Sequence, residues 1–259
     1  MDNVKQKTEK DILKSLMVSN LSFAYDQEMI LNDLSFSAAG GELISILGPN
    51  GVGKSTLFRC ILGLLNRYDG DILIANKNAK KIQAREMAKL VAYIPQSHVL
   101  TFNYSVLDMV LMGSANRISS IGRPKKQEKA EAKEALEKIG ILDLEERGFN
   151  HLSGGEQQLV MLARAVMQNT PIWILDEPLA NLDYGNQISI LQQLKRLAAD
   201  GYLILQSIHN PNQAYQFSDR IICLSEGRII ADGHPKQIMN NALIKALYGN
   251  QVEWSVDAQ

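Results

Sequence analysis

The sequence predicts an α/β fold with three parts: a core built on a parallel sheet, an antiparallel β part at the N-terminus and an inserted helical subdomain. Apolar strands alternate with helical stretches before residue 96 and after residue 171, and such alternation is typical of a parallel, doubly wound sheet. Residues 16–25 alternate between polar and apolar side chains instead, which is the pattern of a strand with one buried face. No convincing strand pattern occurs over residues 97–170.

The N-terminal elements are mostly strands. The segment "ILNDLSFSAAGGELISILG" at 30–48 contains a two-glycine turn, and the strand after that turn is nearly all apolar and therefore buried. A glycine-rich loop follows and leads into a helix at about 53–64. The next elements are predicted as a strand at 71–75, a helix at 83–89 and a strand at 91–95.

The rest of the chain is predicted as helices first and then as alternating strands and helices. Helical patterns cover 105–113, 125–140 and the stretch after "LSGGE". Beyond these, strands are expected at 172–176, 202–209 and 220–227, with helices at 185–199 and 211–217. We therefore expect an extension at 1–15 and one domain over 16–250, whose core (16–96 and 171–250) is interrupted by a helical subdomain at 97–170.

Composition narrows the class of protein. The 259 residues are 46% hydrophobic, which is ordinary for a protein with a well-filled core. A net charge of -1 leaves no basic field for non-specific binding of nucleic acid. The polar N-terminus is unlike a signal peptide, and no apolar run approaches the ~20 residues that span a bilayer. Cys60 and Cys223 are expected to be small buried hydrophobes of a cytoplasmic protein.

A phosphate-binding loop is the strongest motif. "GPNGVGKST" at 48–56 follows an apolar strand and opens a helix, and it matches G-x-x-x-x-G-K-[ST] at Gly48, Gly53, Lys54 and Ser55. Glycines let backbone N–H groups converge on phosphate oxygens at the positive end of a helix. Lys54 is expected to reach the β- and γ-phosphates, and the Ser55 hydroxyl to ligate Mg²⁺. A tight turn would explain the glycines but neither of these side chains.

Two acidic residues end a second apolar strand. In "PIWILDEP" that strand runs into Asp176 and Glu177, at the carboxyl edge of the sheet where ligands bind in open α/β folds. Asp176 would hold Mg²⁺ through water, and Glu177 is the candidate base or positioner for a water that attacks the γ-phosphate. A lone acidic pair after a strand is usually a solvated turn. The accompanying phosphate loop favours the catalytic interpretation.

A third stretch, "HLSGGEQQLV" at 151–160, places a serine and two glycines in front of a helical pattern. A serine hydroxyl and two glycine amides at a helix N-terminus form an anion site, so Ser153, Gly154 and Gly155 are candidates for binding phosphate. The alternative is structural: Ser153 caps the helix and the glycines serve the turn. Ser153 can fill both roles.

Together these motifs resemble the ATP-binding cassette (ABC) family of ATPases, which "LSGGE" separates from other phosphate-loop NTPases. The resemblance covers nearly the whole chain and implies a phosphate-loop NTPase core of the RecA-like type. Four further positions match family motifs in order: Tyr25 where an aromatic stacks on adenine, Gln96 in the Q-loop, "LANLD" at 179–183 as the D-loop, and His209 as the switch histidine. Singly these are weak, since Tyr25 could be a strand aromatic, Gln96 a solvated amide and His209 a satisfied histidine.

The resemblance assigns roles to individual residues around ATP and Mg²⁺. The implied catalytic residues are Lys54, Gln96, Glu177 and His209. The implied metal ligands are Ser55, Gln96 and Asp176. The implied ATP contacts are Tyr25, Gly48, Pro49, Asn50, Gly51, Gly53, Lys54, Ser55, Thr56, Ser153, Gly154, Gly155 and Asp183.

The resemblance also implies partners. In this family the "LSGGE" of one subunit closes on ATP held by a second copy, so a head-to-tail homodimer is expected. Wording such as "FNYSVLDMVLMG" and "HNPNQA" resembles importers for iron-siderophore, haem, cobalamin and similar metal chelates. This implies a membrane permease, an extracytoplasmic binding protein and a place on the cytoplasmic face of the membrane. The alternative is a non-transport ABC ATPase of DNA repair or ribosome function, but the sequence shows neither a long coiled-coil insertion nor a second cassette.

Overall fold

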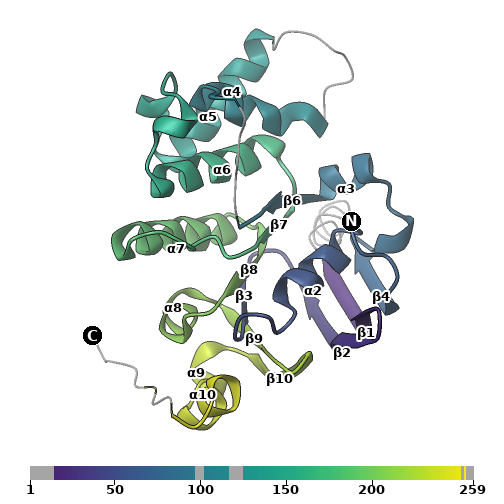
Figure 1. Cartoon of the computed structure of the whole chain (residues 1–259). Helices are drawn as coiled ribbons and strands as arrows, with labels where there is room; N and C mark the ends of the chain where they lie inside the picture. The colour runs from purple at the N-terminus through teal and green to yellow at the C-terminus, as the bar shows by residue number, and fades with distance from the viewer. Residues whose placement is uncertain (1–14, 97–101, 117–124, 252–253, 255–259) are drawn as a thin grey trace, which may run out of the picture.

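The computed structural model describes residues 15–96, 102–116, 125–251 and 254, and two sheets form its frame (Figure 1). A four-stranded antiparallel sheet has the order β2-β1-β4-β5, and a six-stranded sheet has the order β10-β9-β3-β8-β7-β6. The strands are β1 (Leu16–Tyr25), β2 (Glu28–Ala38), β3 (Leu43–Leu47), β4 (Asp69–Ile74), β5 (Lys77–Asn78), β6 (Val91–Ile94), β7 (Ile172–Leu175), β8 (Leu203–Ile208), β9 (Arg220–Ser225) and β10 (Arg228–Gly233).

The helices cover both faces of the larger sheet. They are α2 (Lys54–Ile61), α3 (Ala84–Leu90), α4 (Val106–Leu111), α5 (Lys126–Ile139), α6 (Gly154–Gln168), α7 (Tyr184–Ala199), α8 (Pro211–Phe217), α9 (Pro235–Ile238) and α10 (Asn241–Tyr248). Short 3-10 turns occupy Ala79–Lys81, Met112–Asn116, Leu142–Leu144 and Phe149–His151. The strands and helices that the sequence predicts between residues 16 and 227 occur in the predicted order.

The predicted parallel core is confirmed. Strands β9, β3, β8, β7 and β6 run parallel to one another, and β3 is buried on both faces. Its Leu43 and Leu47 face an apolar layer that includes α7 and the helical subdomain, whereas Ile44 and Ile46 face a layer that includes α2 and the antiparallel sheet. Complete burial of such a side chain contributes about 1.5–3 kcal/mol, so this strand anchors the loop that follows it.

The strand predicted at 71–75 belongs to the antiparallel sheet, whereas the alternation of strands and helices predicts it in the parallel core. This strand, β4, pairs antiparallel with β1, with Leu16 opposite Ile74 and Val18 opposite Ile72. Only alternate side chains of β4 are buried. A run of four apolar residues cannot by itself distinguish a strand buried on one face from a strand buried on both.

The helical subdomain forms as predicted between β6 and β7. Helices α4, α5 and α6 lie together, at the top of Figure 1, and within the described part of 97–170 the only strand-like feature is an isolated bridge between Ser105 and Gly148. Helix α5 buries Ala132, Leu136 and Ile139 at helical spacing and leaves its Lys and Glu residues toward solvent. Residues 97–101 and 117–124, along with the extension up to residue 14, lie outside the described residues.

The C-terminal part contains elements that the sequence analysis did not predict. Strand β10 adds an antiparallel edge to the core sheet by pairing with β9. Helices α9 and α10 then follow, and Ile244 and Leu247 of α10 are buried against the core.

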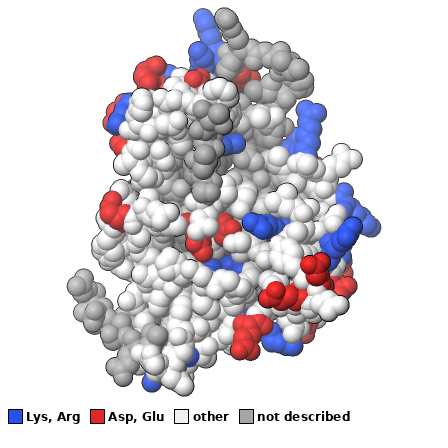
Figure 2. Space-filling model, viewed as in Figure 1, with Lys and Arg blue, Asp and Glu red and all other residues white. Residues whose placement is uncertain are grey.

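The face shown in Figure 2 carries charges of both signs, and both cysteines are buried. Figure 2 shows basic and acidic side chains interspersed over the visible face, without one dominant sign. Cys60 and Cys223 are both free and buried, and burial raises the pKa of each thiol to about 12. No helix among the described residues combines the length and apolar character needed to cross a membrane.

Candidate functional site

The phosphate loop lies between β3 and α2, and close packing requires glycine at its positions 48 and 53. Gly53 caps α2 with a φ of 107°, where a Cβ would stand 2.8 Å from the side chain of Leu31 and 3.1 Å from the carbonyl oxygen of Ile30. A Cβ on Gly48 would lie 2.5 Å from the carbonyl oxygen of Leu224 on β9. The loop is therefore held against β2 and β9, and its N–H groups are aimed by that packing.

Lys54 is buried at the start of α2. Its ammonium donates hydrogen bonds to the carbonyl oxygens of Gly48 (2.8 Å) and Pro49 (2.9 Å), and the residue is only 4% exposed. Burial lowers the pKa of Lys54, while the nearby carboxylates of Glu177 and Asp176 raise it in part. Bound phosphate would add negative charge beside this ammonium and favour its protonated form.

Asp176 and Ser55 are brought together as predicted. Asp176 follows β7, its N–H donates to the carbonyl of Ile94 at 2.9 Å, and its side chain is buried. One carboxylate oxygen, Oδ1, accepts hydrogen bonds from the hydroxyls of Ser55 (3.0 Å) and Ser207 (2.8 Å). The Asp176 carboxylate, just after β7, is therefore joined to the first turn of α2 and to β8.

Glu177 is fixed in an uncommon backbone conformation beside Asp176. Its φ is 48°, in the left-handed region that a residue with a long side chain seldom adopts. Its N–H donates to Ser207 Oγ at 2.7 Å, and its Oε2 accepts from the amide of Gln96 at 2.7 Å. Backbone strain that is held by surrounding bonds is common where a side chain must be aimed.

The switch-histidine candidate lies next to this carboxylate. His209 directly follows β8, and it lines a small cavity of about 70 Å³ together with Glu177 and Ser207. Gln96, Glu177 and His209 thus follow the carboxyl ends of β6, β7 and β8, three neighbouring parallel strands of the core sheet.

Ser207 is a site residue that the sequence analysis missed. It bridges Asp176 and the backbone of Glu177 through one hydroxyl. The signal was present, because "QS" interrupts the otherwise apolar strand "YLILQSIH", and buried polar side chains in a core strand need partners.

The ligand set fits Mg²⁺ only if a nucleotide completes it. The described residues contain no group of three or more His, Cys, Asp or Glu that could hold a metal on its own. Ser55 and Asp176 nevertheless offer adjacent oxygen atoms, and Mg²⁺ is commonly held by one or two protein oxygens with phosphates and water. Gln96 contacts Glu177 rather than Asp176, so its assignment as a metal ligand stays a prediction.

Tyr25 lies at the end of β1, in the hairpin that borders the phosphate loop. Its ring is 41% exposed and contacts Phe23 edge-to-face, with 4.9 Å between ring centroids. The β2 side of this hairpin carries Ile30 and Leu31, which pack against Gly53. The ring is therefore partly exposed on a hairpin that packs against the loop, and its stacking on adenine stays a prediction.

Ser153 caps α6 within its own chain, which confirms the structural interpretation of the serine. Its Oγ accepts from the N–H of Glu156 (3.3 Å) and donates to the Glu156 carboxylate (2.8 Å), which also accepts from the Ser153 N–H (2.7 Å). These bonds with Ser153 are the main reason why the pKa of Glu156 is lowered. The additional role in anion binding stays a prediction.

The two glycines of "LSGGE", Gly154 and Gly155, which we call the signature glycines, pack on the D-loop and the start of α7. A Cβ on Gly155 would lie 2.4 Å from Cγ of Asn186, and a Cβ on Gly154 would lie 3.2 Å from the side chain of Leu182. Asn186 also bonds both carboxylate oxygens of Asp183, at 2.9 and 2.6 Å. We call Ser153, Gly154, Gly155, Asp183 and Asn186 the signature cluster.

The structure separates the predicted nucleotide contacts into two groups. Within the described residues, no hydrogen bond or ion pair joins the signature cluster to the phosphate loop. Ser153 and Asp183 are exposed, whereas Lys54 and Asp176 are buried. One chain therefore presents the predicted nucleotide contacts as two separate groups.

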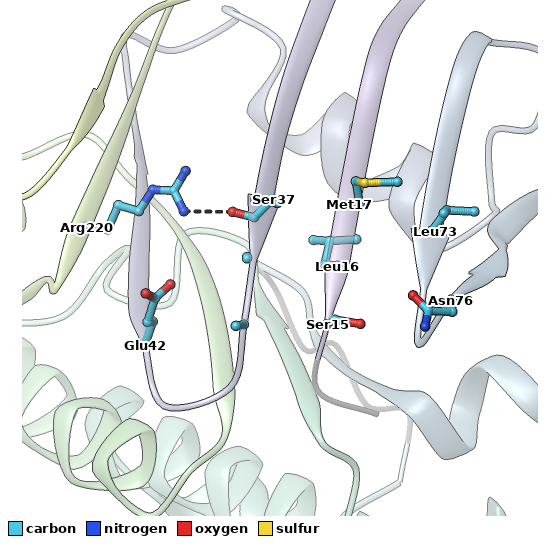
Figure 3. A pocket seen from close by; sticks show the side chains of 10 residues that line it. Ser15, Leu16, Met17, Ser37, Glu42, Leu73, Asn76 and Arg220 are labelled. Atoms are coloured by element: carbon cyan, nitrogen blue, oxygen red, sulfur yellow. Dashed lines mark hydrogen bonds between the residues drawn. The ribbon is translucent and has the colours of Figure 1, made fainter. Parts of the chain in front are cut away.

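A larger cavity of about 400 Å³ lies elsewhere, between the two sheets (Figure 3). Its lining includes Glu42, Arg220, Leu16 and Ser15, and the Arg220 guanidinium donates to the carbonyl oxygen of Ser37 at 2.7 Å. None of the predicted site residues lines it. The kinds of side chain at the carboxyl edge of the core sheet, and not the size of the cavity there, identify that edge as the candidate site.

Comparison with known proteins identifies the family of this arrangement. The ABC transporter family model matches residues 31–180, a range that includes the phosphate loop, the signature glycines and the Asp176–Glu177 pair. The chain belongs to the ABC transporter family. It is an ATP-binding subunit of the kind whose general activity is ATP hydrolysis.

Named relatives of this ABC cassette cover almost its whole length. A Helicobacter pylori protein named as an iron chelatin transport ATP-binding protein is 39% identical over 240 residues, which are 92% of this chain and 94% of the relative. The manganese transport system ATP-binding protein MntB of Bacillus subtilis is 38% identical over 242 residues, or 93% and 94% of the two chains. Among solved structures, a metal-chelate type ABC transporter in an inward-facing conformation matches with a TM-score of 0.80 and 32% identity, over 91% of this chain and 89% of the other.

Proposed function

We propose that this ABC cassette is the ATP-hydrolysing subunit of an importer that takes up a metal chelate through a separate permease. The network that joins Asp176, Glu177 and Gln96 beside the phosphate loop carries the proposal of hydrolysis. The names of the Helicobacter relative and of the structural neighbour support a chelate as the cargo. The manganese relative makes a free metal ion the second candidate.

Each residue of the core site has a role in this proposal. Lys54 exchanges its loop carbonyl partners for the β- and γ-phosphates, and the loop N–H groups bind the same oxygens. Ser55 and Asp176 hold Mg²⁺, which when bound screens the phosphate charge. Glu177 accepts a hydrogen bond from the attacking water, and the amide of Gln96 orients its carboxylate. His209 contacts the γ-phosphate from the end of β8.

The signature cluster serves a second copy of the chain. Because Ser153 and Asp183 are exposed and unconnected to the phosphate loop of their own chain, we infer that they close on the ATP of a partner subunit. The N-terminus of α6 places the positive end of a 15-residue helix dipole at Ser153. ATP then joins two copies head to tail, and hydrolysis removes the phosphate that both copies contact.

The permease is expected to dock beside α4. Phe102 and Tyr104 are 67% and 36% exposed and lie edge-to-face with 6.2 Å between ring centroids. The Tyr104 carbonyl accepts from the N–H of Phe149 at 2.8 Å, so the backbone of Tyr104 is fixed to the helical subdomain. An exposed aromatic pair on a rigid support suits a short amphipathic helix. Residues 97–101, which precede this aromatic pair and are expected to belong to the same docking surface, lie outside the described residues.

Transport of a chelate is tested with the cassette and its permease reconstituted together in proteoliposomes. We expect ATP-dependent uptake of a radiolabelled iron chelate when the binding protein is supplied, and no uptake with a Glu177→Gln cassette. Uptake of Mn²⁺ in place of the chelate would replace the proposed cargo. Failure of the cassette to bind any permease would contradict import and favour the non-transport alternative.

The docking surface gives a second test in the same proteoliposomes. A Phe102→Asp change puts a charge where an apolar helix is proposed to lie, so uptake should fall by at least about tenfold, the effect of ~1.4 kcal/mol lost at the contact. ATP binding by the isolated cassette should not change. Ile230→Asp alters an exposed apolar residue on β10, at the opposite edge of the sheet, and serves as the matched control. Equal loss of uptake in both variants would remove Phe102 from the docking surface.

A further inference from the structure

His209 lies at a bend whose conformation is not set by the sheet. The pairing between β3 and β8 ends at Leu47 and Ile208, and α8 begins at Pro211. The backbone carbonyl of His209 therefore lies beyond the last pair of the ladder. It accepts a hydrogen bond from the hydroxyl of Tyr248, 39 residues further along, at 2.8 Å.

Tyr248 reaches this carbonyl from a helix that is itself well anchored. It is the last residue of α10, next to the buried Leu247, and Asn240 caps the helix by accepting from the N–H of Leu243 at 2.9 Å. Burial, and to a smaller extent Cys223, raises the pKa of Tyr248. The hydroxyl therefore stays protonated at physiological pH and remains a donor.

A second aromatic side chain holds the far side of the same bend. The indole N–H of Trp254 donates to Oδ1 of Asn212, in the first turn of α8, at 2.6 Å, and its ring packs edge-to-face on Tyr215 with 5.5 Å between centroids. The backbone N–H of Trp254 donates to the side-chain oxygen of Asn241, in α10, at 2.8 Å. Tyr248 and Trp254, which we call the C-terminal brace, thus tie α10 to both ends of the segment 209–212.

We propose that Tyr248 is a positioning residue for His209, and that Trp254 supports it by fixing α8 against α10. The inference rests on the proposed role of His209 at the γ-phosphate. The brace reaches the site through the backbone only, so it sets where the imidazole is aimed and makes no contact with ATP. It makes the C-terminal helix a part of the hydrolytic machinery.

The test removes one hydroxyl and measures ATP turnover and ATP affinity separately. Tyr248→Phe should lower kcat about three- to tenfold, the effect of losing one net hydrogen bond that holds a catalytic group. The KM for ATP should stay within about twofold, because the phosphate loop and Tyr25 are untouched. Tyr68→Phe is the matched control, since the buried Tyr68 hydroxyl has no partner among the described residues.

A double variant separates positioning from a general loss of structure. In a His209→Ala background, followed by single-turnover release of γ-phosphate, Tyr248→Phe should cause no further loss of rate. Trp254→Phe, which keeps an aromatic ring but removes the N–H donor to Asn212, should behave in the same way with a smaller effect. It also provides the measurement if Tyr248→Phe does not fold.

The outcomes distinguish this inference from the proposed function. If His209→Ala alone hydrolyses ATP at the wild-type rate, the proposed role of His209 fails and the inference fails with it. If His209→Ala is impaired and Tyr248→Phe matches the wild type, only the positioning role is overturned. A loss from Tyr248→Phe that persists undiminished in the His209→Ala background would also overturn it, because the effect would not act through His209.

Discussion

Replacing Glu177 with glutamine should nearly stop ATP hydrolysis while ATP binding remains. The change keeps the side-chain size and leaves an amide oxygen that can accept from the Gln96 amide, but it removes the negative charge that accepts a proton from water. General-base catalysis contributes roughly 10²–10⁴-fold, so kcat should fall by about 10²-fold or more. Stopped-flow measurement of γ-phosphate release would report the fall, and equilibrium binding of ATP would report the unchanged affinity.

The same variant should accumulate the ATP-bound dimer, because the phosphate that joins two copies is no longer removed. Size-exclusion chromatography with ATP and Mg²⁺ would show the shift. Glu86→Gln removes an exposed carboxylate that pairs with Lys77, so it should leave both rate and dimer unchanged. Near wild-type hydrolysis by Glu177→Gln would exclude Glu177 as the base.

The parallel core could be predicted because its strands are buried on both faces. Residues 172–175 are apolar throughout, and the run ends on Asp176 at the edge where a parallel sheet places its ligands. The β4 strand was assigned to the wrong sheet because the apolar run "ILIA" does not reveal how many of its faces are covered. Pairing with β1 joins residues that are 47 to 58 positions apart in the sequence, which no local pattern records.

The C-terminal elements escaped prediction for a different reason. The β9–β10 hairpin turns on Glu226 and Gly227, which have φ values of 47° and 71°. Asn-Gly or Asp-Gly is the usual sequence signal for such a turn, and Glu seldom adopts a left-handed conformation. Without the turn, β10 and the helices after it had no clear starting point.

The candidate site was largely predictable because most of its residues belong to short, spaced motifs. Lys54 and Ser55 follow from one loop, and Asp176 and Glu177 from one strand end. Ser207 was missed because a single serine in a strand does not reveal which groups it bonds. Its partners, the Asp176 carboxylate and the Glu177 N–H, are brought to it by the neighbouring strand. Ser153 was predicted both as a cap and as an anion ligand, and only the cap is a property of a single chain.

Mixing two inactive variants of the chain should restore ATP hydrolysis, because each chain is proposed to contribute to two ATP sites. A Lys54→Ala chain loses the ammonium beside the phosphates, and a Ser153→Arg chain places a bulky cation in the signature cluster, so each should be nearly inactive alone. A mixed head-to-tail dimer collects both changes in one site. Its other site has an unaltered Lys54 from one chain and an unaltered Ser153 from the other.

The capping role of Ser153 calls for a control. Ser153→Asp keeps a good N-cap for α6 but adds a negative charge at the proposed γ-phosphate contact. Because the Ser153 hydroxyl donates to the Glu156 carboxylate, the variant is combined with Glu156→Gln, which avoids placing two carboxylates side by side. The double variant should fold normally and still be inactive alone. Normal hydrolysis by this double variant would reduce Ser153 to a structural cap.

The central claim, that one ATP is held by two chains, is tested most directly by γ-phosphate release from mixed Lys54→Ala and Ser153→Arg cassettes reconstituted with the permease. Mixing should restore activity, to at most about a quarter of the wild-type rate, because random pairing makes about half of the dimers mixed and each of these has one intact site out of two. Nucleotide trapping at one site per mixed dimer would show the intact site even where the two sites cooperate strictly. If mixed dimers are present and neither release nor trapping returns, the signature cluster does not complete the partner's site.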